Sequence, residues 1–282
     1  MKKIILVLKI IIVVFALIGL FFTIVFIGMQ FGLLNVRGSI TERNKFFTGN
    51  ILNNTLLARP FSTSNRPVYN WEQTPEWNVL STAFTKDAPT INKVASETDV
   101  PARLIVSVVV PEQIRFFTSN RESYKKYFEP LKILGTLSQF SLGVSGIKPE
   151  TAKQIEKNNI DPTSSFYPGD KYKNLLNYPQ GALHDVELYN RLTDPHDHYY
   201  QYLYTALFIK QVMHQWQSSG FDLNNNPEIM ATIFNIGFDH SVPSNQPIVG
   251  GAPIEIGGET LSYGGLSGEF YRSGELLDQF PN

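Results

Sequence analysis

The sequence predicts a mainly α-helical domain behind a single N-terminal transmembrane helix, and three observations support this prediction. The 282 residues are 43% hydrophobic and 13% aromatic, which is enough for a sizeable core. A long uncharged apolar run lies near the N-terminus, and beyond residue 87 the chain shows helix start signals and helical spacing of apolar residues. We therefore expect an anchor over residues 1–35, a stalk or linker over residues 36–85, and a domain over residues 86–282 that ends in an irregular tail.

The charge balance and the cysteine count exclude several classes of function. Lys and Arg number 24 against 25 Asp and Glu, a formal net charge of −1. A dedicated nucleic-acid-binding protein normally has a basic excess, so we expect no nucleic-acid partner. The sequence has no Cys, which excludes disulfides, thiolate metal sites and cysteine nucleophiles.

The N-terminal apolar run predicts a membrane anchor. Lys2, Lys3 and Lys9 precede the uncharged run Ile10–Gly28, and a helix that crosses the hydrocarbon core needs about 20 such residues. Lysines before the run place the N-terminus in the cytoplasm, so the domain would lie outside the cytoplasmic membrane and face the cell wall. The alternative is a cleaved signal peptide, but its apolar core is shorter, about 7–15 residues, and no A-x-A-like cleavage site follows here.

The stalk is expected to have little regular structure and to pack partly onto the domain, because it is rich in Asn and Thr, contains Pro60, Pro67 and Pro75, and carries scattered aromatic residues. Asp87 before Ala88-Pro89 resembles an N-cap followed by an early proline, which predicts that the first helix of the domain begins there.

The next segment, residues 102–110, is apolar nearly all round. This predicts a helix buried at the centre of the domain, although its β-branched residues also fit a buried strand. Pro111 disfavours continued helix at Val110 and predicts an end or a kink, directly before Glu112.

The second half of the chain predicts two further helices and a hairpin. Asp194 as N-cap opens a long helix over residues 194–217, and an Asn-Pro-Glu start signal opens another over residues 226–237. Short candidate strands follow at residues 254–256 and 260–263, within a Gly- and Pro-rich tail.

Three segments in a fixed order resemble the lysozyme-like superfamily, in particular lytic transglycosylases and goose-type lysozymes. Residues 99–113 read DVPARLIVSVVVPEQ, similar to the family's helix that ends in a catalytic Glu-Ser. Residues 143–152 read GVSGIKPETA and align without gaps on GLMQLMPATA; residues 234–237 read FNIG, similar to YNxG. The resemblance covers roughly residues 88–240 and implies a lysozyme-like α(+β) fold.

The sequence departs from the family pattern at several of these positions. Gln113 stands where Ser is usual, Ser145 and Gly146 replace Met and Gln, and Phe234 replaces Tyr. The spacing between the first two segments is long, which implies an insertion around residues 121–130. Arg115 and the basic stretch 121–126 are interpreted as surface around that insertion.

The resemblance implies that Glu112 is the catalytic acid/base of an enzyme that cleaves peptidoglycan glycan strands. It places substrate binding at Gln113, Ser145, Gly146, Phe234 and Asn235, with no cofactor and no metal. In lytic transglycosylases no second carboxylate is obligatory, because the 6-hydroxyl of the sugar itself attacks. Non-hydrolytic cleavage is therefore the first expectation, and hydrolysis by the same Glu the second. Peptidoglycan, the cytoplasmic membrane and an envelope protein complex are the candidate partners.

The chemistry also follows from the residues alone. Cleavage of a glycosidic bond needs a carboxylic acid that is still protonated near neutral pH, and an apolar environment favours the protonated form. Glu112 follows the most apolar stretch of the exported part.

Each feature also has a simpler interpretation. Glu112 would be a solvated helix-end residue, Asn235 a helix C-cap, and Gly143 and Gly146 turn residues. With a degenerate site, the protein would be a peptidoglycan-binding or envelope scaffold protein without catalysis.

Three other groups of residues are candidates for a functional role. The residues from Asp194 to His198 resemble a metal cluster, but a solvated helix start is the better interpretation, because His196 and His198 share no helical face. Glu269 and Glu275 are reserve carboxylates, and the tail over residues 263–270 is a candidate to close over the site.

Overall fold

The computed structural model describes residues 67–118 and 144–281 other than Pro195, together with Lys9, Phe15, Gly19, Leu20 and Phe21. The chain divides into two units, Met1–Leu56 and Leu57–Asn282. Most of the expected anchor, Gly143 and the expected insertion around residues 121–130 lie outside the described residues. In the ranges that the structure describes, we find no helix with the length and apolar character needed to cross a membrane.

The described part of the second unit is mainly helical, as predicted. Its α-helices are α3 (Pro75–Thr98), α4 (Ala102–Thr118), α6 (Pro149–Ile160), α7 (His184–Thr193), α8 (Tyr199–Ser218), α9 (Pro227–Ile236) and α10 (Tyr263–Arg272). Short 3₁₀ helices are η1 (Asn70–Gln73), η4 (Asp170–Tyr172) and η5 (Phe238–His240). One antiparallel hairpin is formed by β1 (Pro253–Ile256) and β2 (Glu259–Ser262), with Ile254 opposite Leu261.

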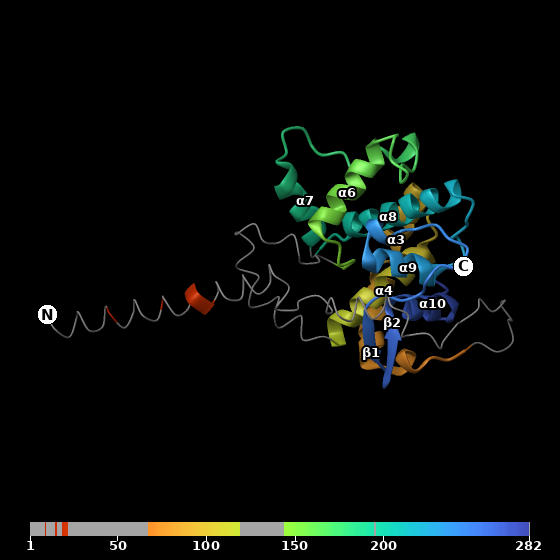
Figure 1. Ribbon diagram of the computed structural model, residues 1–282. Coiled ribbons are helices and arrows are strands. Elements are labelled where there is room, and N and C mark those ends of the chain that lie inside the picture. The colour runs from red at the N-terminus through yellow and green to blue at the C-terminus, as the bar shows by residue number, and fades with distance from the viewer. Residues whose placement is uncertain are drawn as a thin grey trace. The chain divides into compact units, whose positions relative to one another are not determined.

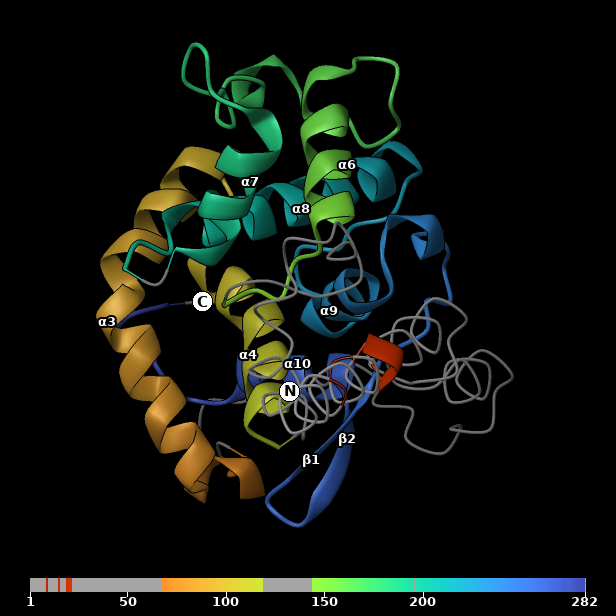
Figure 2. The same cartoon turned by 90° about the vertical axis from the view of Figure 1, so that its left-hand side faces the viewer.

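Helix α4 lies at the centre of this unit, in contact with α3, α8, α9, α10 and β1. Figures 1 and 2 show α6 and α7 on the far side of α8 from α4, and the hairpin beside the other end of α4. The run from Leu104 to Val110 is fully buried, which confirms the predicted central helix and excludes the strand alternative. Of the end or kink predicted at Pro111, the end is wrong: α4 continues to Thr118 with the proline inside it, since the turn beyond the proline is anchored by the fully buried Ile114.

Helix α3 begins earlier than the sequence signals predict. It starts at Pro75 with Thr74 as N-cap, and Pro89 lies inside it, so the start predicted at Asp87 is wrong. The expectation of little regular structure up to residue 85 is wrong for residues 70–85. The reason is burial: Trp77, Leu80, Phe84, Ala88, Ile91, Val94 and Thr98 face the core at steps of three and four. This continuous apolar face outweighs the local signal at the proline.

The N-cap predicted at Asp194 is displaced by four residues, to His198. Helix α8 begins at Tyr199, after a turn in which the Asp194 carboxylate accepts hydrogen bonds from the backbone N–H groups of His196 (2.8 Å) and Asp197 (3.1 Å). Helix α9 is confirmed, with Asn226 before its first-turn proline and Gly237 (φ 98°) at its end.

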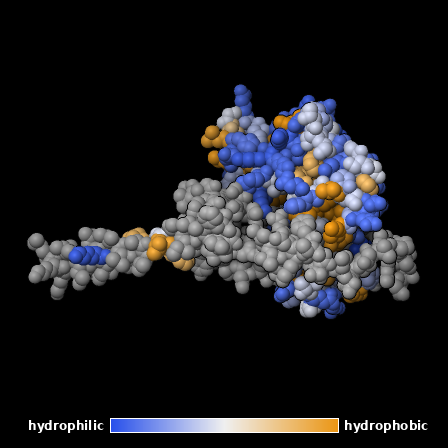
Figure 3. All heavy atoms as spheres, in the orientation of Figure 1, coloured by the Kyte–Doolittle hydropathy of each residue, from blue (hydrophilic) through white to orange (hydrophobic). Residues whose placement is uncertain are grey.

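The hairpin is confirmed, but the tail behind it is not irregular. Residues 263–272 form α10, packed against α4 and α9. Its glycines serve close helix packing: a Cβ on Gly264 would overlap the Thr232 hydroxyl and the Glu228 carbonyl of α9. On the face drawn in Figure 3, hydrophilic residues predominate and the hydrophobic surface is broken into small patches.

Candidate active site

Glu112 lies within α4, one residue beyond the proline, and is 3% exposed. It is therefore not a solvated helix-end residue. The apolar run that precedes it forms the most buried part of the core, and the Glu112 side chain lies at the edge of that core.

Gly146, in the second of the three segments that resemble the lysozyme-like superfamily, lies directly against this carboxylate. Gly146 adopts φ +62°, and a Cβ added to it would lie 2.5 Å from Cδ of Glu112 and 2.6 Å from Cγ. Any L side chain at position 146 would be strained and would also occupy the space of the Glu112 side chain. Glycine at this position thus allows the backbone to cover Glu112.

Two glutamines hold the segment in this position. Gln113 of α4 donates to the Val144 carbonyl, and Gln201 of α8 accepts from the Val144 N–H at 2.6 Å. The hydroxyl of Ser145, which is 1% exposed, donates to the Gln201 carbonyl at 3.1 Å. The structure therefore places Gln113 and Ser145 in contacts that position the loop.

Asn235, in the third of these segments, contacts residues 251 and 252, and Gly251 in turn contacts Tyr263. The Asn235 side chain accepts a hydrogen bond from the Ala252 N–H at 2.9 Å. Gly251 (φ +97°) separates Asn235 from Tyr263: an added Cβ would lie 3.0 Å from Oδ1 of Asn235 and 2.7 Å from Cβ of Tyr263. Phe234 instead packs on the core, edge to face with Phe208 at 5.1 Å between ring centroids.

Tyr263, the first residue of α10, is fully buried and interacts with the charges of Glu112 and Arg115. Its hydroxyl donates to the Val108 carbonyl at 3.0 Å. Burial first, and then the negative charge of Glu112, raise the pKa of Tyr263 well above its usual value, while Arg115 acts in the opposite direction. Tyr263 thus stays a neutral phenol next to the carboxylate.

Arg115 is bonded to Glu112, and the sequence interpretation of it as surface is wrong. One nitrogen, Nη2, donates to Oε1 at 2.8 Å and to Oε2 at 2.6 Å, and the Arg115 and Glu112 side chains are 18% and 4% exposed. Burial is the largest single influence and acts to lower the pKa of Arg115, but the charge of Glu112, Tyr263 and the hydrogen bond to Glu112 together outweigh it, so this pKa is raised. Sequence reasoning missed Arg115 because it ended the helix at Pro111; with the helix continued, the i,i+3 spacing predicts the pair.

The two reserve carboxylates have other partners. Glu269 accepts from the Trp71 indole N–H at 3.0 Å, and Glu275 accepts from that of Trp77 at 2.9 Å. Burial raises the pKa of Glu269, and the Trp71 hydrogen bond acts in the opposite direction. Both carboxylates thus join the N-terminal part of the unit to α10 and the turn that follows it.

The histidines after Asp194 do not gather around a common point. His198 binds Asp87 of α3, with 2.6 Å between Nδ1 and Oδ2, while His196 is exposed. Among the described residues, no group of three His, Asp or Glu side chains is arranged to hold a metal ion.

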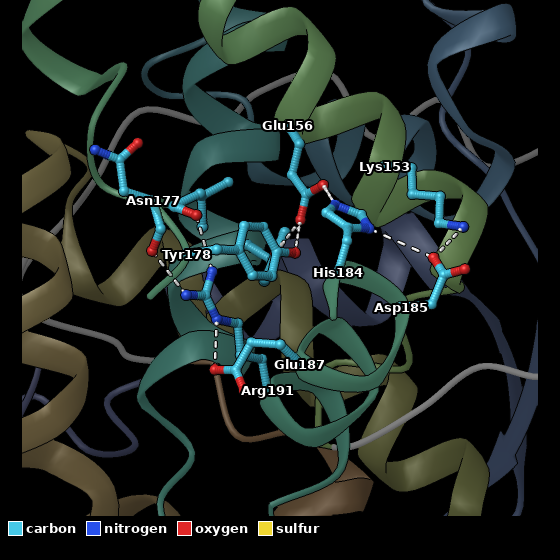
Figure 4. Close-up of polar contacts among 10 residues, drawn as sticks. Lys153, Glu156, Asn177, Tyr178, His184, Asp185, Glu187 and Arg191 are labelled. Carbon is cyan, nitrogen blue, oxygen red and sulfur yellow. Dashed lines mark hydrogen bonds and ion pairs between the residues drawn. The ribbon is translucent and has the colours of Figure 1, made fainter. Parts of the chain in front are cut away.

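A second polar cluster lies between α6, α7 and α8 (Figure 4). Glu156 accepts from the hydroxyls of Tyr178 and Tyr204 through Oε1, and its Oε2 lies 2.7 Å from Nε2 of His184. Arg191 stacks over the Tyr178 ring at 4.0 Å. Since the polar groups of these side chains are paired with one another, we interpret the cluster as a structural link between the three helices.

The chain was compared with protein-family models, with curated proteins and with solved structures, and no match was found in any of the three.

Proposed function

We propose that the protein is a membrane-anchored enzyme that cleaves the glycan strands of peptidoglycan, with Glu112 as the acid/base. The observation that supports this most is the meeting of Glu112 with Gly146. These residues come from two separate segments that resemble the same family, and Gly146 leaves room for the carboxylate because it has no Cβ.

The proposed chemistry uses Glu112 twice. As an acid it gives a proton to the glycosidic oxygen while the bond between C1 and that oxygen breaks. As a base it then takes a proton from the attacking hydroxyl. Attack by the sugar's own 6-hydroxyl leaves a 1,6-anhydro end, and attack by water leaves a reducing end. Asn235 and the backbone around Ser145 are proposed to contact the sugar.

The direct test is digestion of purified peptidoglycan, both intact and with its stem peptides removed, by the full chain in detergent, with products identified by mass spectrometry. We expect 1,6-anhydromuramic ends from the wild type and a loss of at least about 100-fold in Glu112→Gln. The matched control is Glu150→Gln, an exposed glutamate at the start of α6, which should retain full activity. Reducing ends alone would identify a hydrolase. No products from a folded wild type would overturn the enzyme proposal.

One observation favours a second candidate, a peptidoglycan-binding or scaffold protein without catalysis. Glu112 is held by Arg115 in an ion pair, whereas an acid catalyst must carry a proton. A scaffold protein would bind peptidoglycan equally well as wild type and as Glu112→Gln. Sedimentation of both proteins with insoluble peptidoglycan measures this.

The proposed location is the cytoplasmic membrane, with the domain facing the cell wall. It rests on the uncharged run Ile10–Gly28 after three lysines. Membrane fractionation of the full chain and of residues 36–282 tests it: the full chain should resist extraction by high salt and the shorter chain should be soluble. A full chain released by salt alone would contradict an anchor.

A further inference from the structure

The ion pair between Glu112 and Arg115 bears on what the proposed active site binds. Both residues lie on α4, one turn apart, and both carboxylate oxygens accept from the same guanidinium nitrogen. A charge that loses its partner in a buried place is strongly destabilised. Glu112 therefore does not leave Arg115 unless another anion takes its place or Glu112 itself becomes neutral.

The two side chains differ in access to solvent. Arg115 is 18% exposed and Glu112 4%, so a ligand that approaches from solvent meets the guanidinium first. Tyr263 is fully buried and bonded to Val108, and it does not compete for Arg115 as a charged partner.

Among the residues that the structure describes, only one nitrogen of the guanidinium donates to a side chain. Arginine carries five N–H groups in a planar fork, suited to a carboxylate that binds through two oxygens. Within residues 67–118 and 144–281, the hydrogen bonds of Arg115 to side chains come from Nη2 alone and go to Glu112 alone. The chemistry of this fork suits a further carboxylate as partner.

We propose that Arg115 is a positioning and specificity residue that holds Glu112 as an inactive carboxylate until an anionic group of the glycan takes the guanidinium. The ligand class is a glycan with a free carboxylate beside the scissile bond, as on the lactyl group of a muramic residue that carries no stem peptide; a neutral chitin chain and a muramic residue whose lactyl group is amide-bonded to a peptide both lack it. This inference rests on the proposed function, because it takes the glycan as the ligand of the site.

The proton balance follows from the exchange. When Arg115 turns to the ligand carboxylate, the Glu112 carboxylate takes up one proton from solvent. That proton passes to the glycosidic oxygen as the bond to C1 breaks, and Glu112 recovers one from the attacking hydroxyl. Binding of the anionic ligand is thus accompanied by proton uptake, while a complete turnover consumes none.

The experiment is isothermal titration of the full chain in detergent with two ligands that differ in one group. One is a GlcNAc–MurNAc tetrasaccharide with free lactyl carboxylates, and the other is the same tetrasaccharide with lactyl amides. We expect the acid form to bind the wild type about 10- to 100-fold more tightly. Titrations in two buffers of different ionisation enthalpy should show uptake of up to one proton for the acid form only.

Substitutions at the pair separate this role from a structural one. Arg115→Gln should bind both ligands equally, without proton uptake, and Arg115→Lys, which keeps the charge and pairs with Glu112, should recover part of the preference. Glu112→Gln should bind the acid form at least as tightly as the wild type, again without proton uptake. Arg272→Gln is the matched control, because its ion pair with Glu228 has similar exposure, 24% and 10%; it should keep the wild-type preference.

The outcomes for the two proposals are distinct. Equal affinity of the wild type for both ligands, or no binding of either, overturns the role of Arg115. A preference for the acid form with proton uptake, in a wild type that does not cleave peptidoglycan, supports the role of Arg115 while the enzymatic proposal fails.

Discussion

At the scale of single residues, Gly146 is the position where sequence, backbone and candidate site depend most directly on one another. Its φ of +62° disfavours any L side chain, and an added Cβ would overlap Cγ and Cδ of Glu112. We predict that Gly146→Ala displaces the Glu112 side chain and lowers glycan cleavage by about 100-fold. The free energy of unfolding should fall by about 2 kcal/mol, as measured by urea denaturation.

Gly258 provides the control for backbone strain alone. It has φ +79° in the hairpin turn, and an added Cβ would meet nothing within 4 Å. Gly258→Ala should therefore cost about 1 kcal/mol and leave cleavage unchanged. In a Glu112→Ala background, Gly146→Ala should cost no more than Gly258→Ala, because the overlap is gone. If the losses of unfolding free energy in Glu112→Ala and Gly146→Ala added fully in the double variant, the proposed contact would be contradicted.

The sequence predicted the location of the candidate site better than its internal contacts. Glu112 and Gly146 were selected from short motifs, and the structure brings them together. Arg115 was missed because a local rule about proline ended the helix too early. Tyr263 was expected only as part of a tail that could close over the site; its contact with α4 depends on the fold of segments more than a hundred residues apart, for which one sequence offers no signal.

At the scale of elements, Glu156 joins α6 to the start of α7 and to α8. Its side chain is 15% exposed, and it binds two tyrosine hydroxyls and His184. We predict that Glu156→Gln lowers the free energy of unfolding by about 2 kcal/mol, because a neutral amide replaces the charged acceptor of the two tyrosine hydroxyls and His184.

Hydrogen exchange locates this effect, which should appear as faster exchange in residues 170–193. Glu150→Gln is the matched control on the same helix, where an exposed glutamate should contribute less than about 0.5 kcal/mol. Equal effects of the two substitutions would show that Glu156 is not a bridge.

The pair of His198 and Asp87 joins the start of α8 to α3 and is expected to respond to pH. The hydrogen bond to Asp87 raises the pKa of His198 above 6.5, while burial and Lys86 act to lower it and Asp197 to raise it. Burial acts to raise the pKa of Asp87, but the hydrogen bonds from His198 and Tyr202 outweigh it, so this pKa falls below 3.8.

These shifts set the sign of the pH dependence. The contribution of His198 to the free energy of unfolding is complete below pH 6.5 and is lost as pH rises through its raised pKa. The contribution of Asp87 is present above pH 3.8 and is lost as pH falls through its lowered pKa. We predict that the wild type loses about 1–2 kcal/mol more than His198→Gln between pH 6 and pH 9. Urea denaturation at each pH measures this difference. The exposed His196→Gln should follow the wild type, and a flat wild-type profile would contradict the prediction.

The elements themselves were predictable where their signals did not conflict. Helix α9 has a clean start and end, and the hairpin has strand propensity around Gly257 and Gly258. Helix α3 was misplaced because Asp87 and Pro89 imitate a helix start, while the apolar spacing that runs through them received no weight. The glycines of α10 allow close packing on α9, but from sequence they indicated an irregular tail.

At the scale of the whole molecule, the burial of residues before the predicted domain boundary bears on which part of the chain can fold by itself. Trp71, Trp77, Leu80 and Phe84 lie before the predicted boundary at residue 86, yet each is at most 3% exposed. The two indole rings pack edge to face at 4.9 Å and donate to Glu269 and Glu275. The region predicted as a stalk thus contributes part of the core.

We predict that residues 57–282 fold cooperatively and that residues 86–282 do not. Loss of one large buried aromatic side chain costs about 3–5 kcal/mol, so the loss of two tryptophans, a phenylalanine and a leucine approaches the 5–15 kcal/mol that stabilises a typical domain. Thermal unfolding by circular dichroism should show a sharp transition for residues 57–282 and for residues 67–282, which retain this cluster. The fragment from residue 86 should show reduced helicity and bind a hydrophobic dye. A sharp transition at the same temperature in that fragment would mean that the core is complete without α3's first half, and the stalk boundary at residue 85 would be restored.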